Sequence, residues 1–398
     1  MDITITPGTL SGTVTVIPSK SQAHRLLICA AFADGQTTLH CPETSRDMDA
    51  TAECLNALGA SIRSGDGGYQ VTPAGDISKV AHLYCHDSGS TLRFLLPLAG
   101  ALGVDTTFHL EGRLPQRPLS PLWEEMERMG CTLSRPTWDT IRCQGKLRPG
   151  TYALDGSISS QFFTGLLLAF PLMEGMSRIR TIGKLESKPY VTMTLDAMEA
   201  FGVSGKAMTV SGGHGYRSPE ELTVEGDWSN GAFFLAAQAL GSDLTVCGLS
   251  PTSSQGDRAA ARWIAALKTH QTIPAGDIPD LVPILSIVAA CHQGAVFTDI
   301  HRLRLKESDR VSSILAMLAA LGGHGEATEN TLTVYGTGLI GGTVDSCNDH
   351  RIAMAAAMAA TVCRENVTIL DSQCVQKSYP RFWEEYSRLG GNYEQHLR

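Results

Sequence analysis

The feature that most constrains the fold is a signature that recurs along the chain. An amphipathic segment ends in leucine or another large residue plus glycine, and a short alternating segment follows. Five copies are clear, each centred on one glycine: Gly59, Gly130, Gly202, Gly322 and Gly390. The interval between Gly202 and Gly322 is close to twice the others, and a degenerate copy, RWIAALKTHQTI (262–273), fits there. The pattern therefore predicts about six similar units.

Each copy predicts a helix, a glycine at the end of that helix and a strand. In VSSILAMLAAL (311–321), apolar residues recur at the helical spacing, and TLTVYG (331–336) alternates with period two. The chain contains no G-x-G-x-x-G and no Walker A string, so repeated α/β units are favoured over a dinucleotide-binding core. Six units divide into two domains of three, which meet near TVEGDWSN (223–230).

Composition indicates a soluble, globular, cytoplasmic protein. Hydrophobic residues make up 43% and charged residues 18% of the chain, and the net charge of −8 argues against general affinity for nucleic acid. The longest apolar run, FFTGLLLAFPLM (162–173), is too short to span a bilayer, and the N-terminus does not resemble a signal peptide. Eleven cysteines without a C-x-x-C pair suit reduced thiols in the cytosol.

Several polar clusters in the first half stand immediately before predicted helices. They are Lys20, Ser21 and Arg25 in PSKSQAHR, the turn DSGSTLRF (87–94), Ser159, Ser160 and Gln161 in GSISSQFFTG, and Ser187, Lys188 and Tyr190 in SKPY. Helix N-termini bind anions through free N–H groups, and cations nearby add to this attraction. Ordinary helix caps with solvated charges are the alternative for each cluster.

The second half repeats this arrangement. Asp277 and Asp280 precede an apolar run, His350 and Arg351 open another, Lys377 lies in VQKSYP, and Lys306, Glu307 and Arg310 lie in HRLRLKESDRV (301–311). An aspartate at a helix start is usually a cap, but one facing a dry cleft is able to act as a general base. Together, the clusters predict a polyanion site in a cleft between the domains.

A metal site is not indicated. His82 and His86 in HLYCH lie in a predicted strand, where they do not share a helical face with a glutamate, and zinc needs more ligands than this spacing supplies. We expect no metal and no cofactor.

An ordered series of strings across both halves resembles the 5-enolpyruvylshikimate-3-phosphate synthase family. The strings are SKSQAHR, SGSTLR, QRPL, GSISSQF, SKPY, EGDWS, QGD, IPD, LKESDR, NDHR and the lysine of QKSYP. The resemblance implies an α/β fold, a two-domain inside-out α/β barrel in which each domain contains three βαβαββ repeats. It implies an N-terminal, shikimate 3-phosphate-binding domain at 19–225 and a C-terminal domain formed by 1–18 and 226–398.

The resemblance also implies the reaction. The 5-hydroxyl of shikimate 3-phosphate would attack C2 of phosphoenolpyruvate while C3 takes a proton, and loss of a C3 proton and of phosphate would follow. Such chemistry needs a base, a proton donor and compensation of several negative charges. The implied partners are these two small substrates only, without nucleic acid or membrane, and a monomer is expected.

Site residues carry over position by position as expectations. Lys20, Ser21, Arg25, Ser159, Ser160, Gln161, Ser187, Asp280 and Lys306 match the shikimate 3-phosphate site. Lys20, Gly89, Arg117, Gln161, Arg310, Arg351 and Lys377 match the phosphoenolpyruvate site. Asp280, Glu307 and Lys20 match the catalytic positions, with Asp280 at the substrate hydroxyl and Glu307 at the methylene; His350 and Tyr190 would support them.

Two positions depart from the family pattern. Asp87 stands in DSGS where NAGT is frequent, which brings a carboxylate close to an expected anion, and His24 stands where asparagine is frequent.

One alternative function is that of the related transferase that acts on UDP-N-acetylglucosamine, but EGRLPQRPLSPL (111–122) lacks the reactive cysteine typical of that enzyme. A non-catalytic phosphosugar-binding relative is the other alternative.

Overall fold

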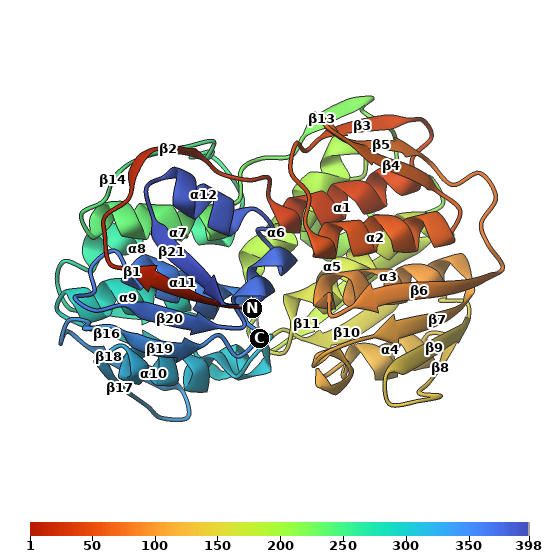
Figure 1. Cartoon of the computed structure of the whole chain (residues 1–398). Helices are drawn as coiled ribbons and strands as arrows, with labels where there is room; N and C mark the ends of the chain where they lie inside the picture. Colours follow the sequence, from red (N-terminus) through yellow and green to blue (C-terminus); the bar gives the residue numbers. More distant parts are fainter. Residues whose placement is uncertain (397–398) are drawn as a thin grey trace. The chain divides into compact units, whose positions relative to one another are not determined.

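The chain folds into two compact units, of which one is a continuous stretch of the sequence and the other combines the first and last segments. The structure, a computed structural model, describes residues 1–396 (Figure 1). One unit, the central unit, comprises residues 18–225; the other, the terminal unit, comprises residues 1–17 and the chain from 226 onward. The second crossing between them, at 225/226, lies within the TVEGDWSN segment.

The central unit contains three sheets, in the strand orders β13-β3-β5-β4, β6-β7-β9-β8 and β10-β11-β12. Its strands are β3 (Thr37–His40), β4 (Ser61–Gly65), β5 (Gly68–Thr72), β6 (Val80–His86), β7 (Asp105–Leu110), β8 (Cys131–Ser134), β9 (Thr140–Gly145), β10 (Thr151–Asp155), β11 (Met176–Ile182), β12 (Thr209–Ser211) and β13 (Glu221–Thr223). Its helices are α1 (Lys20–Ala31), α2 (Arg46–Ala57), α3 (Gly89–Leu102), α4 (Leu122–Arg128), α5 (Ser160–Ala169) and α6 (Lys188–Ala200), with 3-10 turns η1 (Leu114–Gln116), η2 (Phe170–Leu172) and η3 (Lys206–Met208).

The terminal unit also contains three sheets, in the orders β19-β20-β1-β21, β15-β16-β18-β17 and β14-β2. Its strands are β1 (Asp2–Thr6), β2 (Ser11–Thr15), β14 (Asp243–Cys247), β15 (Gln271–Pro274), β16 (Ala295–Thr298), β17 (His324–Ala327), β18 (Thr331–Tyr335), β19 (Gly342–Asp345), β20 (Val367–Leu370) and β21 (Asn392–His396). Its helices are α7 (Trp228–Ala239), α8 (Ala259–Ala266), α9 (Val282–Cys291), α10 (Arg310–Ala320), α11 (His350–Ala359) and α12 (Phe382–Arg388), with η4 (Gly256–Arg258), η5 (His301–Leu305) and η6 (Ser372–Lys377).

Four of the six sheets share one pairing scheme, which is the structural form of the sequence repeat. In the β6–β9 sheet, β6 pairs parallel with β7, β7 pairs antiparallel with β9, and β9 pairs antiparallel with β8. The β15–β18 sheet repeats this scheme. Four of the six sheets have the expected four strands; the β10 sheet has three and the β2 sheet two among the described residues.

The recurring glycines end helices as predicted. Each follows a large residue at the end of a helix and has a positive φ: Gly59 (115°), Gly130 (117°), Gly202 (76°), Gly322 (77°) and Gly390 (95°). A side chain is disfavoured in this conformation, which explains why glycine recurs there. The degenerate copy forms α8 and β15, and Leu267 at the end of α8 is followed by Lys268 in place of glycine.

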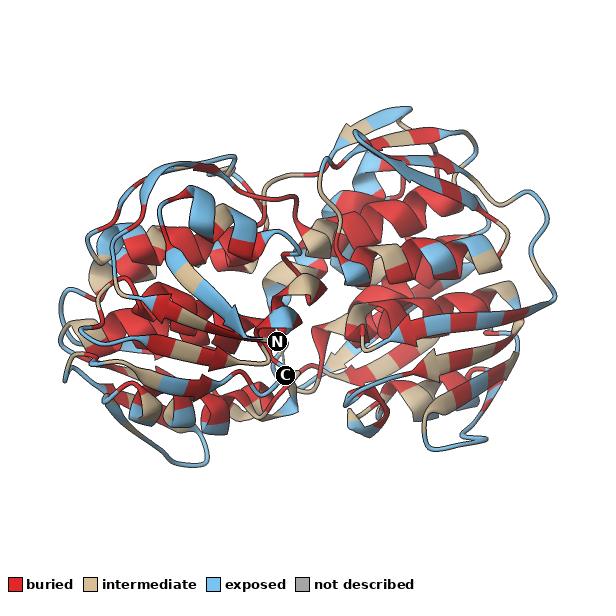
Figure 2. Cartoon of the chain, viewed as in Figure 1, coloured by how far each residue is buried: buried red, intermediate tan, exposed pale blue. Residues whose placement is uncertain are grey.

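In each unit the largely buried helices lie on the inner side of the sheets, whereas the short helices α4, α8 and α12 keep exposed faces. All ten residues of α11 are buried, whereas β6 alternates exposed and buried residues along its length (Figure 2). This distribution places two separate hydrophobic cores, one per unit, between the helices and the inner faces of the sheets. The predicted two-domain α/β fold is confirmed. Within residues 1–396, no helix is both long and apolar enough to cross a membrane.

Candidate active site

Two arginine side chains converge on the first residue of α3 in the central unit. A Cβ atom placed on Gly89 would lie 2.6 Å from Nη1 of Arg117 and 3.1 Å from Nη1 of Arg93. The Nε atom of Arg117 is buried and has no hydrogen-bond partner among the described residues. Ser88 caps the helix by accepting a hydrogen bond from the Thr91 N–H. Two guanidinium groups beside a helix N-terminus form an arrangement that attracts an anion.

Gln161 holds one of these arginines in place. Its Oε1 accepts a hydrogen bond from Nη1 of Arg93 at 2.8 Å, and its Nε2 donates to Oγ of Ser90 at 3.0 Å. Ser159 caps α5 by accepting from the Gln161 N–H, and Ser160 is buried beside it. The GSISSQF segment therefore combines the ordinary cap with a side chain that reaches the Gly89 anion site.

Lys20 is the first residue of α1 and forms an ion pair with the start of α2. Its Nζ lies 3.0 Å from Oδ2 of Asp47, and both side chains are largely buried, with 13% and 7% exposed. The predicted Lys20 is thus held by a carboxylate within its own unit.

Arg25 is buried, with four of its five N–H groups directed to protein acceptors. Nε donates to Oγ1 of Thr194, Nη1 to the carbonyl of Ser21, and Nη2 to Oγ1 of Thr164 and the carbonyl of Tyr190. These bonds tie α1 to α5 and α6. One N–H of Arg25 is left for a ligand. Ser187, which precedes α6, is buried with a φ of 52°.

In the terminal unit, Arg310 binds three carboxylates. Its Nε donates to Oδ2 of Asp349 at 2.8 Å, Nη1 to Oδ1 of Asp280 at 2.5 Å, and Nη2 to Oε2 of Glu307 at 2.8 Å. The Arg310 side chain is only 1% exposed. Oγ of Ser308 donates a further hydrogen bond to Asp349. Arg310 therefore fixes the positions of both predicted catalytic carboxylates.

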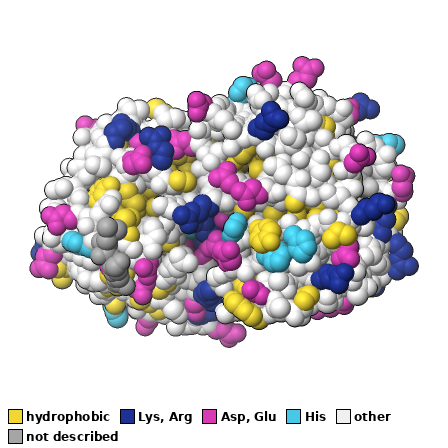
Figure 3. All heavy atoms as spheres, turned by 45° about the vertical axis from the view of Figure 1, so that its right-hand side comes forward, with side chains coloured by type: hydrophobic (Ala, Val, Ile, Leu, Met, Phe, Trp, Pro, Cys, Tyr) yellow, Lys and Arg dark blue, Asp and Glu magenta, His cyan; other side chains and the backbone are white. Residues whose placement is uncertain are grey.

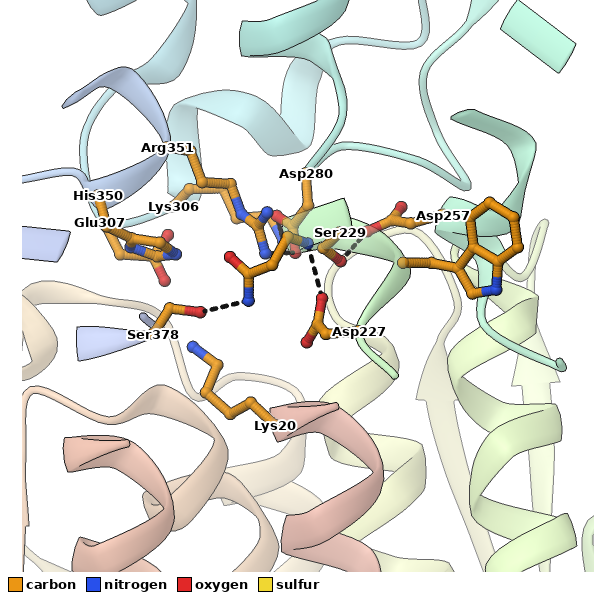
Figure 4. Close-up of polar contacts among 12 residues, drawn as sticks. Lys20, Asp227, Ser229, Asp257, Asp280, Lys306, Glu307, His350, Arg351 and Ser378 are labelled. Atoms are coloured by element: carbon orange, nitrogen blue, oxygen red, sulfur yellow. Dashed lines mark hydrogen bonds and ion pairs between the residues drawn. The ribbon is translucent and has the colours of Figure 1, made fainter. Parts of the chain in front are cut away.

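Asp280 is surrounded by two more cations. Oδ1 lies 3.4 Å from Nζ of Lys306, and Oδ2 accepts a hydrogen bond from Nη2 of Arg351 at 3.3 Å (Figure 4). Burial alone would raise the pKa of Asp280, but the charges of Arg351, Lys306 and Arg310 outweigh it and hold this pKa well below its usual range. Loss of hydration lowers the pKa of Lys306 to about 8, although Asp280 opposes that shift. Asp280 does not cap α9, which has no side-chain cap.

Two further predicted residues of this unit, His350 and Lys377, are buried. His350 opens α11 directly after its cap Asp349, and its Nδ1 lies 3.9 Å from Oδ1 of Asp349. Lys377 is the last residue of η6 and is 8% exposed. In the LKESDR string, Asp309 is the helix cap of α10, while Lys306 and Glu307 contribute to the Asp280 and Arg310 cluster.

A buried carboxylate that the sequence did not single out lies in η4. Asp257 is 1% exposed and Oγ of Ser229 donates a hydrogen bond to its Oδ2, while its Oδ1 has no partner in the described part of the chain. Burial and the negative charge of Asp280 raise the pKa of Asp257 to about 7. Asp257 therefore keeps its proton in slightly acidic solution, unlike an ordinary aspartate.

This proton predicts a pH-dependent stability. The folded state keeps it up to about pH 7, whereas the unfolded chain loses it near pH 4, so the folded state binds more protons in between and stability falls as pH rises. Between pH 5 and pH 8, the free energy of unfolding of wild type should fall by about 1–4 kcal/mol relative to Asp257→Asn. Urea denaturation at both pH values measures this difference. The exposed-site variant Asp243→Asn should follow wild type, and equal pH slopes for wild type and Asp257→Asn would contradict the prediction.

Sequence reasoning did not single out Arg93, Asp47, Asp257 or Asp349. Arg93 stands four residues after Gly89, which places it on the same face of a helix one turn later, so the spacing contained a usable signal. Asp349 precedes His350 at a cap position. Asp47 and Asp257 come from other segments, and their contacts depend on how the chain folds back.

No group of three or more histidine, cysteine, aspartate or glutamate side chains within residues 1–396 is placed to hold a metal ion. In β6, His82 and His86 face solvent together; His82 contacts His109 and His86 contacts Glu111, in separate pairs. The predicted strand for HLYCH is confirmed.

The family model of EPSP synthase (3-phosphoshikimate 1-carboxyvinyltransferase) matches residues 5–386. A 3-phosphoshikimate 1-carboxyvinyltransferase of Clostridium kluyveri is 36% identical over 419 aligned positions, which cover 99% of this chain and 98% of the relative. The protein of the same description from Clostridium perfringens is 37% identical and covers 98% of each chain.

Solved structures share the fold. An EPSP synthase from Acinetobacter baumannii superposes with a TM-score of 0.81 at 23% identity, covering 99% of this chain and all of that one. The enolpyruvyl transferase NikO from Streptomyces tendae gives a TM-score of 0.77 at 18% identity, covering 100% of this chain and 99% of that one. At these identities, the likeness concerns the fold.

Proposed function

The chain belongs to the EPSP synthase family, and from this membership we propose that it transfers the enolpyruvyl group of phosphoenolpyruvate to shikimate 3-phosphate. The products are 5-enolpyruvylshikimate 3-phosphate and phosphate. The observation that carries the proposal is the cluster of Asp280, Lys306, Glu307 and Arg310. The reaction transfers protons at two positions and binds two anionic substrates, and this cluster offers two carboxylates for the proton transfers and cations for the anions.

The reaction is an addition followed by an elimination. The 5-hydroxyl oxygen bonds to C2 of phosphoenolpyruvate, its proton passes to a base, and C3 takes a proton to become a methyl group. The C2–O bond to phosphate then breaks, and a proton leaves C3 to restore the double bond. One base and one group that both donates and accepts a proton suffice.

In the central unit, we assign the phosphoenolpyruvate anion to Gly89, Arg93 and Arg117, with Gln161 orienting Arg93. The shikimate 3-phosphate ligands of this unit are drawn from the polar residues at the starts of α1, α5 and α6: Lys20, Ser21, Arg25, Ser159, Ser160, Gln161 and Ser187. Because Arg25 has a single N–H left, its main effect is to hold Ser21 and Tyr190 in place. We propose residues 18–225 as the shikimate 3-phosphate-binding domain.

In the terminal unit, Asp280 is the base for the 5-hydroxyl and Glu307 exchanges the proton at C3. A carboxylate held by three cations is a weak base. Substrate phosphate and carboxylate groups compete for Lys306, Arg310 and Arg351, so their binding weakens the hold of these cations on Asp280 and Glu307. The basicity of both carboxylates then rises only when the substrates are present. Lys377 and Arg351 add positive charge for phosphoenolpyruvate, and Lys20 is assigned to both substrates.

Phosphate release tests the function. Purified protein should release phosphate from phosphoenolpyruvate with shikimate 3-phosphate and not with UDP-N-acetylglucosamine. Release of phosphate only when phosphoenolpyruvate is combined with UDP-N-acetylglucosamine would identify the related transferase. Release with neither second substrate would support a non-catalytic binding protein.

Gly89→Ala should raise the KM for phosphoenolpyruvate at least about tenfold, because the new methyl group displaces the Arg117 and Arg93 guanidinium groups from the helix start. The KM for shikimate 3-phosphate should change less than about twofold and the melting temperature little, since the backbone at Gly89 is helical and both contacts are flexible side-chain ends. Steady-state kinetics with each substrate varied measure both values.

Gly75→Ala is the matched control, because a Cβ at Gly75 meets no atom within 4 Å. A Gly89→Ala variant with unchanged phosphoenolpyruvate KM would refute the assignment of this anion site.

We further propose a cytoplasmic monomer. All eleven cysteines are free thiols, and eight of them are buried in the cores of the two units, which suits a reducing compartment: Cys29, Cys41, Cys54, Cys85, Cys131, Cys143, Cys363 and Cys374. On the face shown in Figure 3, acidic and basic side chains are interspersed, with no broad basic area for nucleic acid. Light scattering coupled to size exclusion tests the monomer.

A further inference from the structure

A chain of buried side-chain hydrogen bonds crosses the central unit from α1 to the start of α3. Nδ1 of His24 lies 2.7 Å from Oγ1 of Thr51 in α2, which lies 2.7 Å from Oγ1 of Thr91 in α3. Thr91 Oγ1 in turn lies 2.8 Å from Oγ of Ser88, the residue that caps α3. All four residues are at most 1% exposed. We call His24, Thr51, Thr91 and Ser88 the relay.

The relay has a defined direction. Thr91 donates its hydroxyl hydrogen to Ser88, so its oxygen accepts from Thr51; Thr51 then accepts from Nδ1–H of His24. Oγ of Ser88 also accepts the N–H of Thr91 that begins α3. The first donor of the series is therefore the imidazole, and its last acceptor is the helix cap.

His24 is suited to a fixed donor role. Burial lowers the pKa of its imidazole to about 3, so the ring stays neutral while the protein is folded. Its Nε2 has no hydrogen-bond partner among the described residues, and the ring packs edge-on against Phe94 of α3 at 6.1 Å between centroids. A neutral ring with one N–H places that hydrogen on Nδ1, where Thr51 receives it.

The two ends of the relay adjoin residues assigned to substrates. His24 precedes Arg25 on the helix that begins with Lys20, and Ser88 precedes Gly89. The same hydroxyl hydrogen of Thr91 lies within reach of a second acceptor, the carbonyl of Asp47 at 3.4 Å, and the carboxylate of Asp47 binds Lys20. The relay thus connects α1 and the start of α3, which carry assigned ligands of the central unit, through Thr51 of α2.

We propose that the relay positions the first turn of α3 and thereby sets the affinity for phosphoenolpyruvate, with His24, Thr51 and Thr91 as positioning residues that do not touch substrate. This inference rests on the proposed function, because it takes the Gly89 start of α3 as the phosphoenolpyruvate site. Its physical basis is that buried hydroxyl groups hydrogen-bonded in series fix the separation of the elements that carry them, and loss of one link leaves its neighbours unsatisfied. A Cβ atom placed on Gly89 would lie only 2.6 Å and 3.1 Å from the two guanidinium groups, so a shift of the helix start by a few tenths of an ångström changes the space between them.

Thr51→Val breaks the relay at its centre without changing side-chain size, and Thr51→Ser restores the hydroxyl. We expect Thr51→Val to raise the KM for phosphoenolpyruvate about five- to twentyfold, with kcat and the KM for shikimate 3-phosphate within about twofold of wild type. Thr51→Ser should return the phosphoenolpyruvate KM to within about twofold of wild type. A merely structural hydroxyl would not separate one KM from the other.

Thr106→Val is the matched control. Thr106 is a fully buried threonine of the same unit whose hydroxyl donates to the Val104 carbonyl, outside the relay. This variant should lose similar stability and keep both KM values. If Thr51→Val behaves like Thr106→Val, or changes kcat and both KM values in parallel, the relay does not set affinity.

A second pair tests the donor end should Thr51→Val fold poorly. The Nδ2 of asparagine occupies the place of Nδ1, so His24→Asn should keep the phosphoenolpyruvate KM, whereas His24→Leu should raise it as Thr51→Val does. Equal KM values for these two variants would also overturn the inference. Wild-type protein without phosphate release from the two substrates would instead overturn the proposed function, so the two failures are distinguishable.

Discussion

Lys306→Met should lower kcat/KM about a thousandfold while leaving the folded protein as stable as wild type or more stable. Few substitutions separate these two properties so widely. The expectation follows from the burial of the Lys306 ammonium group. Its charge lowers the free energy of unfolding, and we expect it to be compensated by an anionic ligand.

The cost of this ammonium follows from its pKa. Burial lowers the pKa from 10.5 to about 8, so between these values the folded state binds fewer protons than the unfolded chain and stability rises with pH. At pH 7 the charged ammonium destabilises the fold by about 3 kcal/mol, the free energy that corresponds to this shift in pKa. Asp280 would keep Arg310 and Arg351 as partners after the substitution, so it would not be left unpaired. We therefore expect the free energy of unfolding at pH 7 to rise by about 0–3 kcal/mol.

The catalytic cost follows from the chemistry. Lys306 is the most exposed of the three cations that contact Asp280, at 19% against 5% for Arg351 and 1% for Arg310, and so it is the one most accessible to a substrate phosphate. Urea denaturation and phosphate release on the same preparation measure the two properties. Lys268→Met, at an exposed lysine of the same unit, should leave both unchanged. Parallel loss of stability and turnover in Lys306→Met would make Lys306 a structural residue.

Much of the architecture was predictable because it is repeated. A glycine with positive φ after a large apolar residue ends helix after helix, and this local requirement is visible in single residues such as Gly59 and Gly322. The strand TLTVYG and the helix of 311–321 appeared within one residue of their predicted bounds. The β10 and β2 sheets deviate from the four-stranded pattern. In the three-stranded β10 sheet, the last strand, β12, ends at Ser211, and Gly212 and Gly213 follow it.

The candidate site was predictable by residue type but not by partnership. The string LKESDR placed Lys306, Glu307 and Arg310 together because they are neighbours in sequence. It gave no sign that Arg310 would also bind Asp280 and Asp349, from two other helix starts. Such pairings depend on the packing of α9, α10 and α11 against one another, which no local pattern encodes.

The same reason separates caps from functional carboxylates. Asp309 and Asp280 look alike in sequence, since each precedes an apolar helix. In the structure Asp309 accepts N–H groups of its own helix, whereas Asp280 faces three cations from other segments. The general rule that an aspartate before a helix is a cap fits Asp309 but not Asp280, whose contacts depend on how three helices pack together.

Arg310→Met should abolish measurable turnover and destabilise the protein by about 3–5 kcal/mol at pH 7, because it leaves buried carboxylates without their shared counter-ion. Asp349 would retain Ser308, the N-terminus of α11 and the His350 ring at 3.9 Å, none of them a guanidinium, and Glu307 would lose its Arg310 contact. Burial is nearly complete here, with 1% of Arg310 and none of Asp349 exposed, so solvent cannot replace the guanidinium.

The pH dependence of this loss has a definite sign. In wild type, the cations hold the pKa of Asp280 well below its usual range, so Asp280 contributes stability above pH 4 that is lost as pH falls through the folded-state value. Without Arg310 this contribution shrinks, and the remaining carboxylates can take up protons. The difference in the free energy of unfolding between wild type and variant should therefore be largest near pH 7 and smaller at pH 5, as urea titrations at both values would show.

Arg304→Met provides the contrast within the same eleven-residue string. Arg304 is 37% exposed and pairs with Asp309 at 3.5 Å, so its loss should cost less than about 1 kcal/mol and leave turnover unchanged. Arg310→Lys separates charge from geometry, because an ammonium retains the positive charge but cannot place hydrogen bonds on three carboxylates at once. If the lysine variant recovered full turnover, charge alone would explain Arg310. If Arg310→Met lost no more stability than Arg304→Met, the three ion pairs of Arg310 would not stabilise the fold. The expected order of stability, Arg304→Met above Arg310→Lys above Arg310→Met, follows from the number and burial of the carboxylates that lose a hydrogen bond or ion pair in each variant.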